Sequence, residues 1–438
     1  MSRPAAVAFL LFLGTGSALP ALTLEAALAR TAERNPAIQQ AKLQLEAAAG
    51  RRLVLRSTAL PDLRVLVPGG VQGGQRAGEN KVQPFVFGRG SLTQPLFQAA
   101  IPASYRRGDL ELLIAQQRFN VAMTEQLHAA RIAYLTAAYQ DSLRTVAEEQ
   151  EQRLAGNARA EAQRYEAGKA NRGAVTVARL LQQELKPRIE ESRRISNGAL
   201  LQLAQGMADE LGPGGKLPAV ETALLWHDAP GDVEAQAPAA VANRPDLQLA
   251  RLLVRAAGED QRIIEAGYFP AINGSLSGDY IPVTEVRRGS EGSGRRADDV
   301  ISSEIRAGLT YTWRVVDNGT VRGAALRQRA AREINEVVLA RLEAEVPREL
   351  ARIQNNLEAL SARKQALERA STVAEHTVGD VLNNLHEGLA SQLEYRTAES
   401  SFLQTKGNLL TTTYEQNLAL ANLDRVTGRY LEFSHDTR

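Results

Sequence analysis

The chain has 438 residues, and its 52 Lys and Arg against 50 Asp and Glu leave a formal net charge of only +2, so no strong basic field attracts nucleic acid. It has no cysteine, which excludes disulfides, thiolate metal sites, a thiol nucleophile and a lipidated N-terminal cysteine. Aromatic residues make up 5% of the chain, while Ala, Leu, Glu, Gln and Arg are abundant. This composition predicts long helices packed through small side chains and a thin core.

Residues 1–21 are predicted to be a secretory signal peptide. Arg3 provides a short basic region, an apolar run extends from Ala5 to Leu13, and cleavage is expected after Ala18 or Ala21. No later segment has the roughly 18 to 20 consecutive apolar residues that a transmembrane helix needs. We therefore expect an exported protein that can cross a membrane only with strands.

The remainder of the chain is predicted to contain two copies of one structural repeat. Pro36 and Pro245 lie at equivalent positions, and the same offset relates Pro61 to Pro270. In each copy an Ala-rich amphipathic helix ends at the second proline and gives way to an extended segment. We expect residues 22–210 to be the first repeat, 211–238 a crossover or equatorial region, 239–428 the second repeat, and 429–438 a C-terminal tail.

Each repeat is predicted to contain one β-hairpin, at about 62–97 and at about 271–315. Residues 301–313 alternate between apolar and polar side chains, which is typical of a transmembrane strand. The second hairpin has the length of about 9 to 11 residues that a tilted spanning strand needs, whereas the first is shorter, with a Gly-rich polar loop at 68–80. Tyr280, Tyr311 and Trp313 are candidate lipid-interface aromatics, and the alternative is that they belong to a soluble sheet.

A helix of about 60 residues is predicted after each hairpin. Each of these helices ends in a glycine turn, at Gly168 or Gly388, from which helices return. Helices of this length have to pack laterally against neighbours, as in a coiled coil. Pro187 and Pro347 are expected to bend or divide the helices that contain them.

Four strands in a bilayer leave two sheet edges with unpaired N–H and C=O groups, each of which costs several kcal/mol in hydrocarbon. A single chain therefore cannot complete such a sheet. Two copies give eight strands, whose interior is filled by side chains, whereas three give twelve and leave a lumen. The strands thus predict an oligomeric pore that the helices continue.

Several motifs resemble the duplicated signature of the TolC-type outer-membrane efflux and secretion channels. They are Leu24-Glu25-Ala26-Ala27-Leu28 with Asn35-Pro36, Ala242-Asn243-Arg244-Pro245-Asp246-Leu247, and Tyr268-Phe269-Pro270. The resemblance extends over the whole predicted mature chain. It implies a mainly α fold with a transmembrane β-barrel part, in which a homotrimer forms a 12-stranded barrel and a long periplasmic α-helical coiled-coil barrel.

The resemblance also implies a function and a location. The chain would be the channel of a tripartite efflux or type I secretion system in the outer membrane of a Gram-negative-type envelope. It would be a passive conduit opened at its helical tips by a periplasmic adaptor and an inner-membrane pump of RND, ABC or MFS type. The residues alone leave a second possibility, a periplasmic coiled-coil structural or tethering protein.

The family pattern points to candidate residues at the helical tips. Family members carry carboxylates shortly after the second glycine turn, and Glu394 occupies that place here. Three copies would form an acidic ring that favours cations, and the alternative is a solvated helix carboxylate. Where family members carry further gate residues, this chain has Ala174, Ala390 and Thr397. The candidate adaptor contacts are Gly168, Lys169, Ala170, Gly388, Leu389 and Ala390, although helix C-capping alone explains the two glycines.

No catalytic, cofactor-binding or metal-binding residues are predicted. The five histidines show no metal-ligand spacing, and the Gly-rich stretch at 69–74 lacks the Gly-Lys-Ser/Thr ending of a phosphate loop. The arginines between residues 287 and 296 alternate with acidic residues, as in a solvated extracellular loop. We therefore expect a protein that is not an enzyme and has no cofactor.

Overall fold

The computed structural model describes residues 21–76, 79–209, 217–228, 230–280 and 303–431. The predicted signal peptide, apart from Ala21, and the charged loop at 281–302 lie outside these ranges. The chain forms two compact units. Unit 1 consists of the described parts of residues 1–38, 123–234 and 350–438, and unit 2 of those of 39–122 and 235–349.

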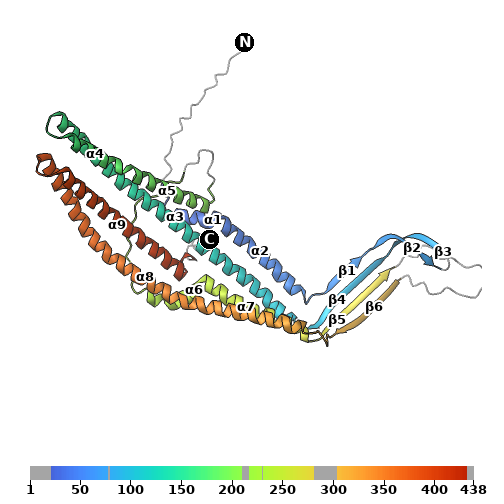
Figure 1. Ribbon diagram of the computed structural model, residues 1–438. Coiled ribbons are helices and arrows are strands. Elements are labelled where there is room, and N and C mark those ends of the chain that lie inside the picture. The colour runs from blue at the N-terminus through green and yellow to red at the C-terminus, as the bar shows by residue number, and fades with distance from the viewer. Residues whose placement is uncertain (1–20, 77–78, 210–216, 229, 281–302, 432–438) are drawn as a thin grey trace, which may run out of the picture. The chain divides into compact units, whose positions relative to one another are not determined.

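Unit 2 contains an antiparallel sheet of four strands in the order β1-β4-β5-β6 (Figure 1). The strands are β1 (Asp62–Leu66), β4 (Gly88–Gln98), β5 (Ala271–Tyr280) and β6 (Ser303–Thr312). Strands from both predicted repeats meet in this sheet, because β4 pairs with β5 along their whole length. The β1–β4 and β5–β6 pairs are the hairpins expected from the sequence.

The first hairpin is longer than the sequence predicted. The residues expected to be a Gly-rich loop form β2 (Gly69–Arg76) and β3 (Glu79–Val86), which pair antiparallel from Gly69 with Val86 to Arg76 with Glu79. The loop assignment at 68–80 was therefore wrong. Glycine weakens a strand but leaves its backbone N–H and C=O groups free to pair, so the cross-strand ladder prevails over side-chain propensity.

The helices of unit 2 are connected by ion pairs between neighbours. They are α2 (Pro36–Ser57), the first part of α3 (Ile101–Glu166), α6 (Ala237–Asn243), α7 (Pro245–Glu265) and the first part of α8 (Thr320–Glu387). Asp109 of α3 binds Arg52 of α2 at 2.9 Å, and Arg107 of α3 binds Asp260 of α7 at 2.8 Å. The apolar cluster between α3 and α7 is small, with Leu110, Ile114 and Ala256 at its centre, as the composition predicted.

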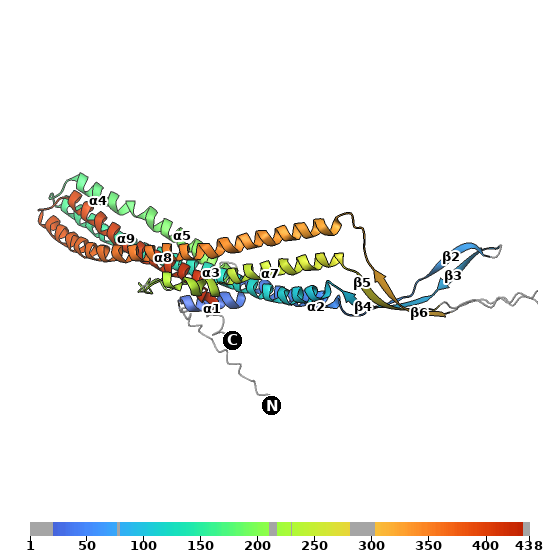
Figure 2. The same cartoon turned by 90° about the horizontal axis from the view of Figure 1, so that it is seen from below.

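Unit 1 contains the helical hairpins. Its helices are α1 (Leu24–Arg34), the second part of α3, α4 (Arg172–Glu184), α5 (Lys186–Gly206), the second part of α8 and α9 (Gln392–Thr427). Pro187 lies in the first turn of α5 and separates it from α4, whereas α8 continues through Pro347. Proline is tolerated in the first turn because the N–H there has no partner within the helix. In both views of the ribbon, α3, α4, α8 and α9 run alongside one another (Figures 1 and 2).

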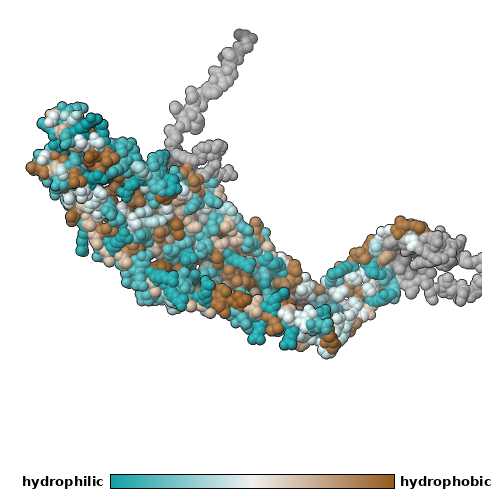
Figure 3. Space-filling model, viewed as in Figure 1, coloured by the Kyte–Doolittle hydropathy of each residue, from teal (hydrophilic) through white to brown (hydrophobic). Residues whose placement is uncertain are grey.

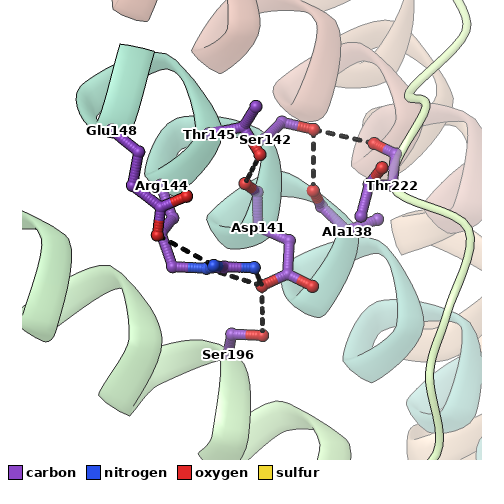
Figure 4. Close-up of polar contacts among 8 residues, drawn as sticks. All are labelled: Ala138, Asp141, Ser142, Arg144, Thr145, Glu148, Ser196 and Thr222. Carbon is purple, nitrogen blue, oxygen red and sulfur yellow. Dashed lines mark hydrogen bonds and ion pairs between the residues drawn. The ribbon is translucent and has the colours of Figure 1, made fainter. Parts of the chain in front are cut away.

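Polar side chains of unit 1 hold part of the segment that connects the two repeats. Ser142 of α3 donates a 2.7 Å hydrogen bond to the carbonyl of Thr222, and Asp141 beside it accepts one from Ser196 of α5 at 3.2 Å (Figure 4). Asn417 of α9 donates to the carbonyl of Leu225 at 3.0 Å. The hydrogen bonds of Ser142 and Asn417 fix Thr222 and Leu225 against α3 and α9. None of the helices in the described ranges is long and apolar enough to cross a membrane.

Candidate functional site

The four-stranded sheet has one apolar face. Leu63 of β1 lies opposite Leu92 of β4, Leu92 opposite Leu276 of β5, and Leu276 opposite Ala307 of β6, so these side chains share a face. Most large apolar side chains on it are exposed, with 78% of Ile305 and 74% of Val65 accessible. Apolar side chains are also visible on the surface along the strands in Figure 3. A contiguous apolar face of this kind marks contact with lipid or with another protein.

The opposite face of the sheet is charged but balanced. Arg89 of β4 binds Asp279 of β5 at 2.6 Å, and Arg64 of β1 binds Asp62 on the same strand at 2.6 Å. On β6, Glu304 and Arg306 form a third pair. Each carboxylate on this face has an arginine partner, so the face is wet without a net excess of either charge.

The two edges of the sheet are complementary in direction. Among the described strands, β1 and β6 each have a neighbour on one side only, and they run antiparallel to each other because three antiparallel pairings separate them. The β6 edge of one copy can therefore pair with the β1 edge of another in the same antiparallel sense. Such pairing satisfies the edge groups that a bilayer leaves unpaired.

The predicted interface aromatics lie at opposite ends of the sheet. Tyr280 pairs with Ser303 at one end, whereas Tyr311 pairs with Ile272 at the other, next to Trp313. Eight residues from Tyr280 to Ile272 span about 27 Å at roughly 3.4 Å per residue, close to the apolar band of about 25 Å in membrane barrels. Sequence reasoning missed further exposed aromatics at the Trp313 end, Phe97, Tyr268 and Phe269, whose position next to the strand ends was the available signal.

Both predicted tips are tight glycine turns. Gly168 has φ of +72° and Gly388 has φ of +82°, and the next residue donates a 2.7 Å hydrogen bond back into the preceding helix in each case. This is the left-handed C-cap that glycine favours. Lys169 and Leu389 are exposed at the tips, whereas Ala170 and Ala390 are half-buried.

Glu394, the predicted gate carboxylate, caps the start of α9. Its Oε2 accepts a 2.6 Å hydrogen bond from the N–H of Ser391, and the Ser391 hydroxyl accepts one from the N–H of Glu394 at 3.2 Å. This reciprocal pair is a capping box, which the Ser-x-x-Glu spacing could have predicted. The first tip has Ala174 at the matching place and no such box. Glu394 remains exposed, so capping leaves its charge available to solvent.

The helices just below the tips form a shared core that the sequence did not predict in detail. Its buried members come from both hairpins: Leu154, Leu181, Leu185, Val378, Leu385, Tyr395 and Phe402. Glu399 of α9 is also buried there, where burial raises the pKa of its carboxyl. In the described ranges no group of His, Asp and Glu side chains is placed to hold a metal ion.

A family model described as "Outer membrane efflux protein" matches residues 237–429, which include the whole of the second predicted repeat. No curated protein sequence matches significantly.

Several solved outer-membrane proteins share the fold. The outer membrane protein VceC from Vibrio cholerae is 16% identical, with 92% of this chain and 96% of that chain covered and a TM-score of 0.75. The CmeC outer membrane channel of Campylobacter jejuni is 12% identical, with 92% and 85% covered and a TM-score of 0.76. The MtrE outer membrane channel of Neisseria gonorrhoeae, solved in its open state, is 18% identical, with 92% and 88% covered and a TM-score of 0.73.

At these identities the likeness to solved structures establishes the fold alone. The match to the family model associates residues 237–429 with outer-membrane efflux proteins. The resemblance to the TolC-type channels predicted from the sequence is therefore confirmed: residues 237–429 match the outer membrane efflux protein family, and the chain shares the fold of solved outer-membrane channels.

Proposed function

We propose that three copies of the chain form a passive duct through the outer membrane, and that this duct is the channel component of a tripartite efflux or type I secretion system. The observation that carries the proposal is the single sheet with an exposed apolar face, a charge-balanced wet face and two free edges. Three copies provide twelve strands, enough to enclose a water-filled lumen. The wet face then lines the lumen and the apolar face contacts outer-membrane lipid.

The helices next to the sheet edges also favour association. α2 leads into β1 and carries exposed Leu43 and Val54, three turns apart, whereas α8 follows β6 and carries exposed Leu326, Ile334 and Val337. Apolar side chains are visible over the α7 and α8 region in Figure 3. These stripes lie at helical spacing and are not covered by any of the described residues of the same chain. A neighbouring copy joined edge to edge would bring one α2 beside another α8.

The proposed gate is the pair of glycine tips, with Glu394 as the candidate carboxylate of a ring formed by three copies. An acidic ring at a constriction favours cations and restricts anions. The proposed contact surface for a periplasmic adaptor consists of the two tips: Gly168, Lys169 and Ala170 at one, and Gly388, Leu389 and Ala390 at the other. Leu389 is 75% exposed there. The adaptor would connect the channel to an inner-membrane pump of RND, ABC or MFS type, which provides the energy of transport.

The experiment that tests the proposal is a planar-bilayer recording with the full-length protein purified from outer membranes. The duct predicts discrete conductance steps that increase when the cognate adaptor is added. A protein recovered entirely in the soluble periplasmic fraction, with no conductance at any concentration, would refute the proposal and favour the tethering alternative.

A further inference from the structure

A polar seam crosses the apolar core below the tips. On α3 it consists of Arg153 and Asn157, and on α9 of Gln392, Tyr395 and Glu399. Only 1% of Tyr395, 2% of Glu399 and 6% of Asn157 is exposed, so these three residues are the buried part of the seam, whereas the side chain of Arg153 is 43% exposed. α3 belongs to the hairpin that turns at Gly168 and α9 to the one that turns at Gly388, so the seam joins the two hairpins.

The seam makes few hydrogen bonds for the number of polar atoms it buries. Nδ2 of Asn157 donates to Oε1 of Gln392 at 3.1 Å, and the Tyr395 hydroxyl donates to Oε1 of Glu399 at 2.9 Å. The nearest cation, Nε of Arg153, lies 3.6 Å from the same Oε1. Oε2 of Glu399, Oδ1 of Asn157 and Nε2 of Gln392 are buried without a partner among the residues that the structure describes.

This arrangement costs free energy whenever the hairpins are packed. An unpaired buried polar atom forfeits the hydrogen bonds it has in water, and a buried carboxylate with a loosely placed counter-ion forfeits more. Leu154 and Phe402 next to the seam show that the surroundings suit apolar side chains. Separation of α3 from α9 would hydrate the three unpaired atoms and recover this cost.

We propose that this seam is a built-in weak point between the hairpins, which lowers the work needed to separate them and so sets how readily the tips open. Glu399 is its principal positioning residue, since it combines burial, charge and an unpaired oxygen. The inference rests on the proposed gate at the tips. The seam has the opposite effect on the open probability from that of a contact that holds the tips closed. Removal of such a contact raises the open probability, whereas removal of this buried charge lowers it.

Glu399→Gln is the direct test, because the amide keeps the acceptor for Tyr395 and removes the charge. In planar bilayers at pH 8 we expect its open probability to fall about fivefold or more, because the substitution replaces a buried charge by a neutral amide, which costs less to bury. The double variant Asn157→Leu, Gln392→Leu should change it in the same direction. Glu415→Gln is the matched control, because Glu415 lies on the same helix in an exposed ion pair with Arg363 and should leave the open probability unchanged.

Thermal unfolding provides a second readout, in which Glu399→Gln should raise the midpoint. The inference would be wrong if the open probability of Glu399→Gln stayed the same or increased, or if its midpoint were lower. In that case the wild-type conductance would still support the duct. A wild-type protein that forms no pore would refute the duct itself and, with it, the gate on which the inference rests.

Discussion

The apolar face of the sheet makes a quantitative prediction for a single buried charge. Leu276 lies on that face midway between the rows of Tyr280 and Tyr311, about 14 Å from each. Lysine on the lipid face near the bilayer midplane costs about 2–4 kcal/mol. With three copies in one barrel, Leu276→Lys should therefore destabilise the assembly by about 6–12 kcal/mol.

Ser275→Lys is the matched control, because Ser275 is the adjacent exposed residue of β5 and points to the wet face. The assay is chemical unfolding of the protein from lipid vesicles, together with recovery of each variant in the outer-membrane fraction. Leu276→Lys should be lost from the membrane fraction, whereas Ser275→Lys should be recovered almost as well as wild type. Equal losses in both variants would refute the assignment of the two faces.

Three further predictions concern the tips. Glu394→Ala should raise single-channel conductance and weaken cation preference, because the acidic ring is lost. The control Ser391→Ala breaks the capping box and keeps the carboxylate, so it should cost about 0.5–2 kcal/mol of stability without changing the conductance. Equal conductance in the two variants would show that Glu394 is not part of the gate. Burial raises the pKa of Glu399, whose facing groups are Arg153 and Tyr395, so the packed hairpins bind its proton more tightly than separated hairpins do. The packing of the hairpins is therefore most stable below the ordinary carboxyl pKa, and this stability is lost as pH rises through the raised value. The open probability of the wild type should increase from pH 5 to pH 8, whereas that of Glu399→Gln should not change with pH. Gly388→Ala should cost about 1–2 kcal/mol of stability, because φ is positive there. No neighbouring atom lies near the added methyl group, so the whole cost comes from the backbone conformation. An unchanged midpoint of thermal unfolding would contradict the C-cap geometry.

The sequence predicted the elements whose pattern is periodic or punctuated. Strict alternation identified β6, and glycine after a long helical pattern identified both turns, because a left-handed C-cap strongly favours glycine. β2 was missed because a strand rich in glycine has no side-chain period to detect, and β3 because it begins with polar residues and contains Pro84, which disfavours a strand. Pairing with the partner strand, which sequence reasoning on one segment does not see, determines their structure.

The candidate site was predictable only in part. The positions of the tips follow from the glycines, but the capping role of Glu394 required attention to Ser391 three residues earlier. The burial of Glu399 had no local signal, since a glutamate in a long amphipathic helix is usually solvated. Its burial results from the packing of α3 against α9, two segments more than 200 residues apart in the sequence.

The proposed duct requires several identical chains to complete one pore wall. The most direct test is the mass of the complex extracted from outer membranes in mild detergent, measured by native mass spectrometry or by light scattering with the detergent contribution subtracted. We predict a complex of three chains. A stable single chain under conditions in which it still conducts ions would contradict the account.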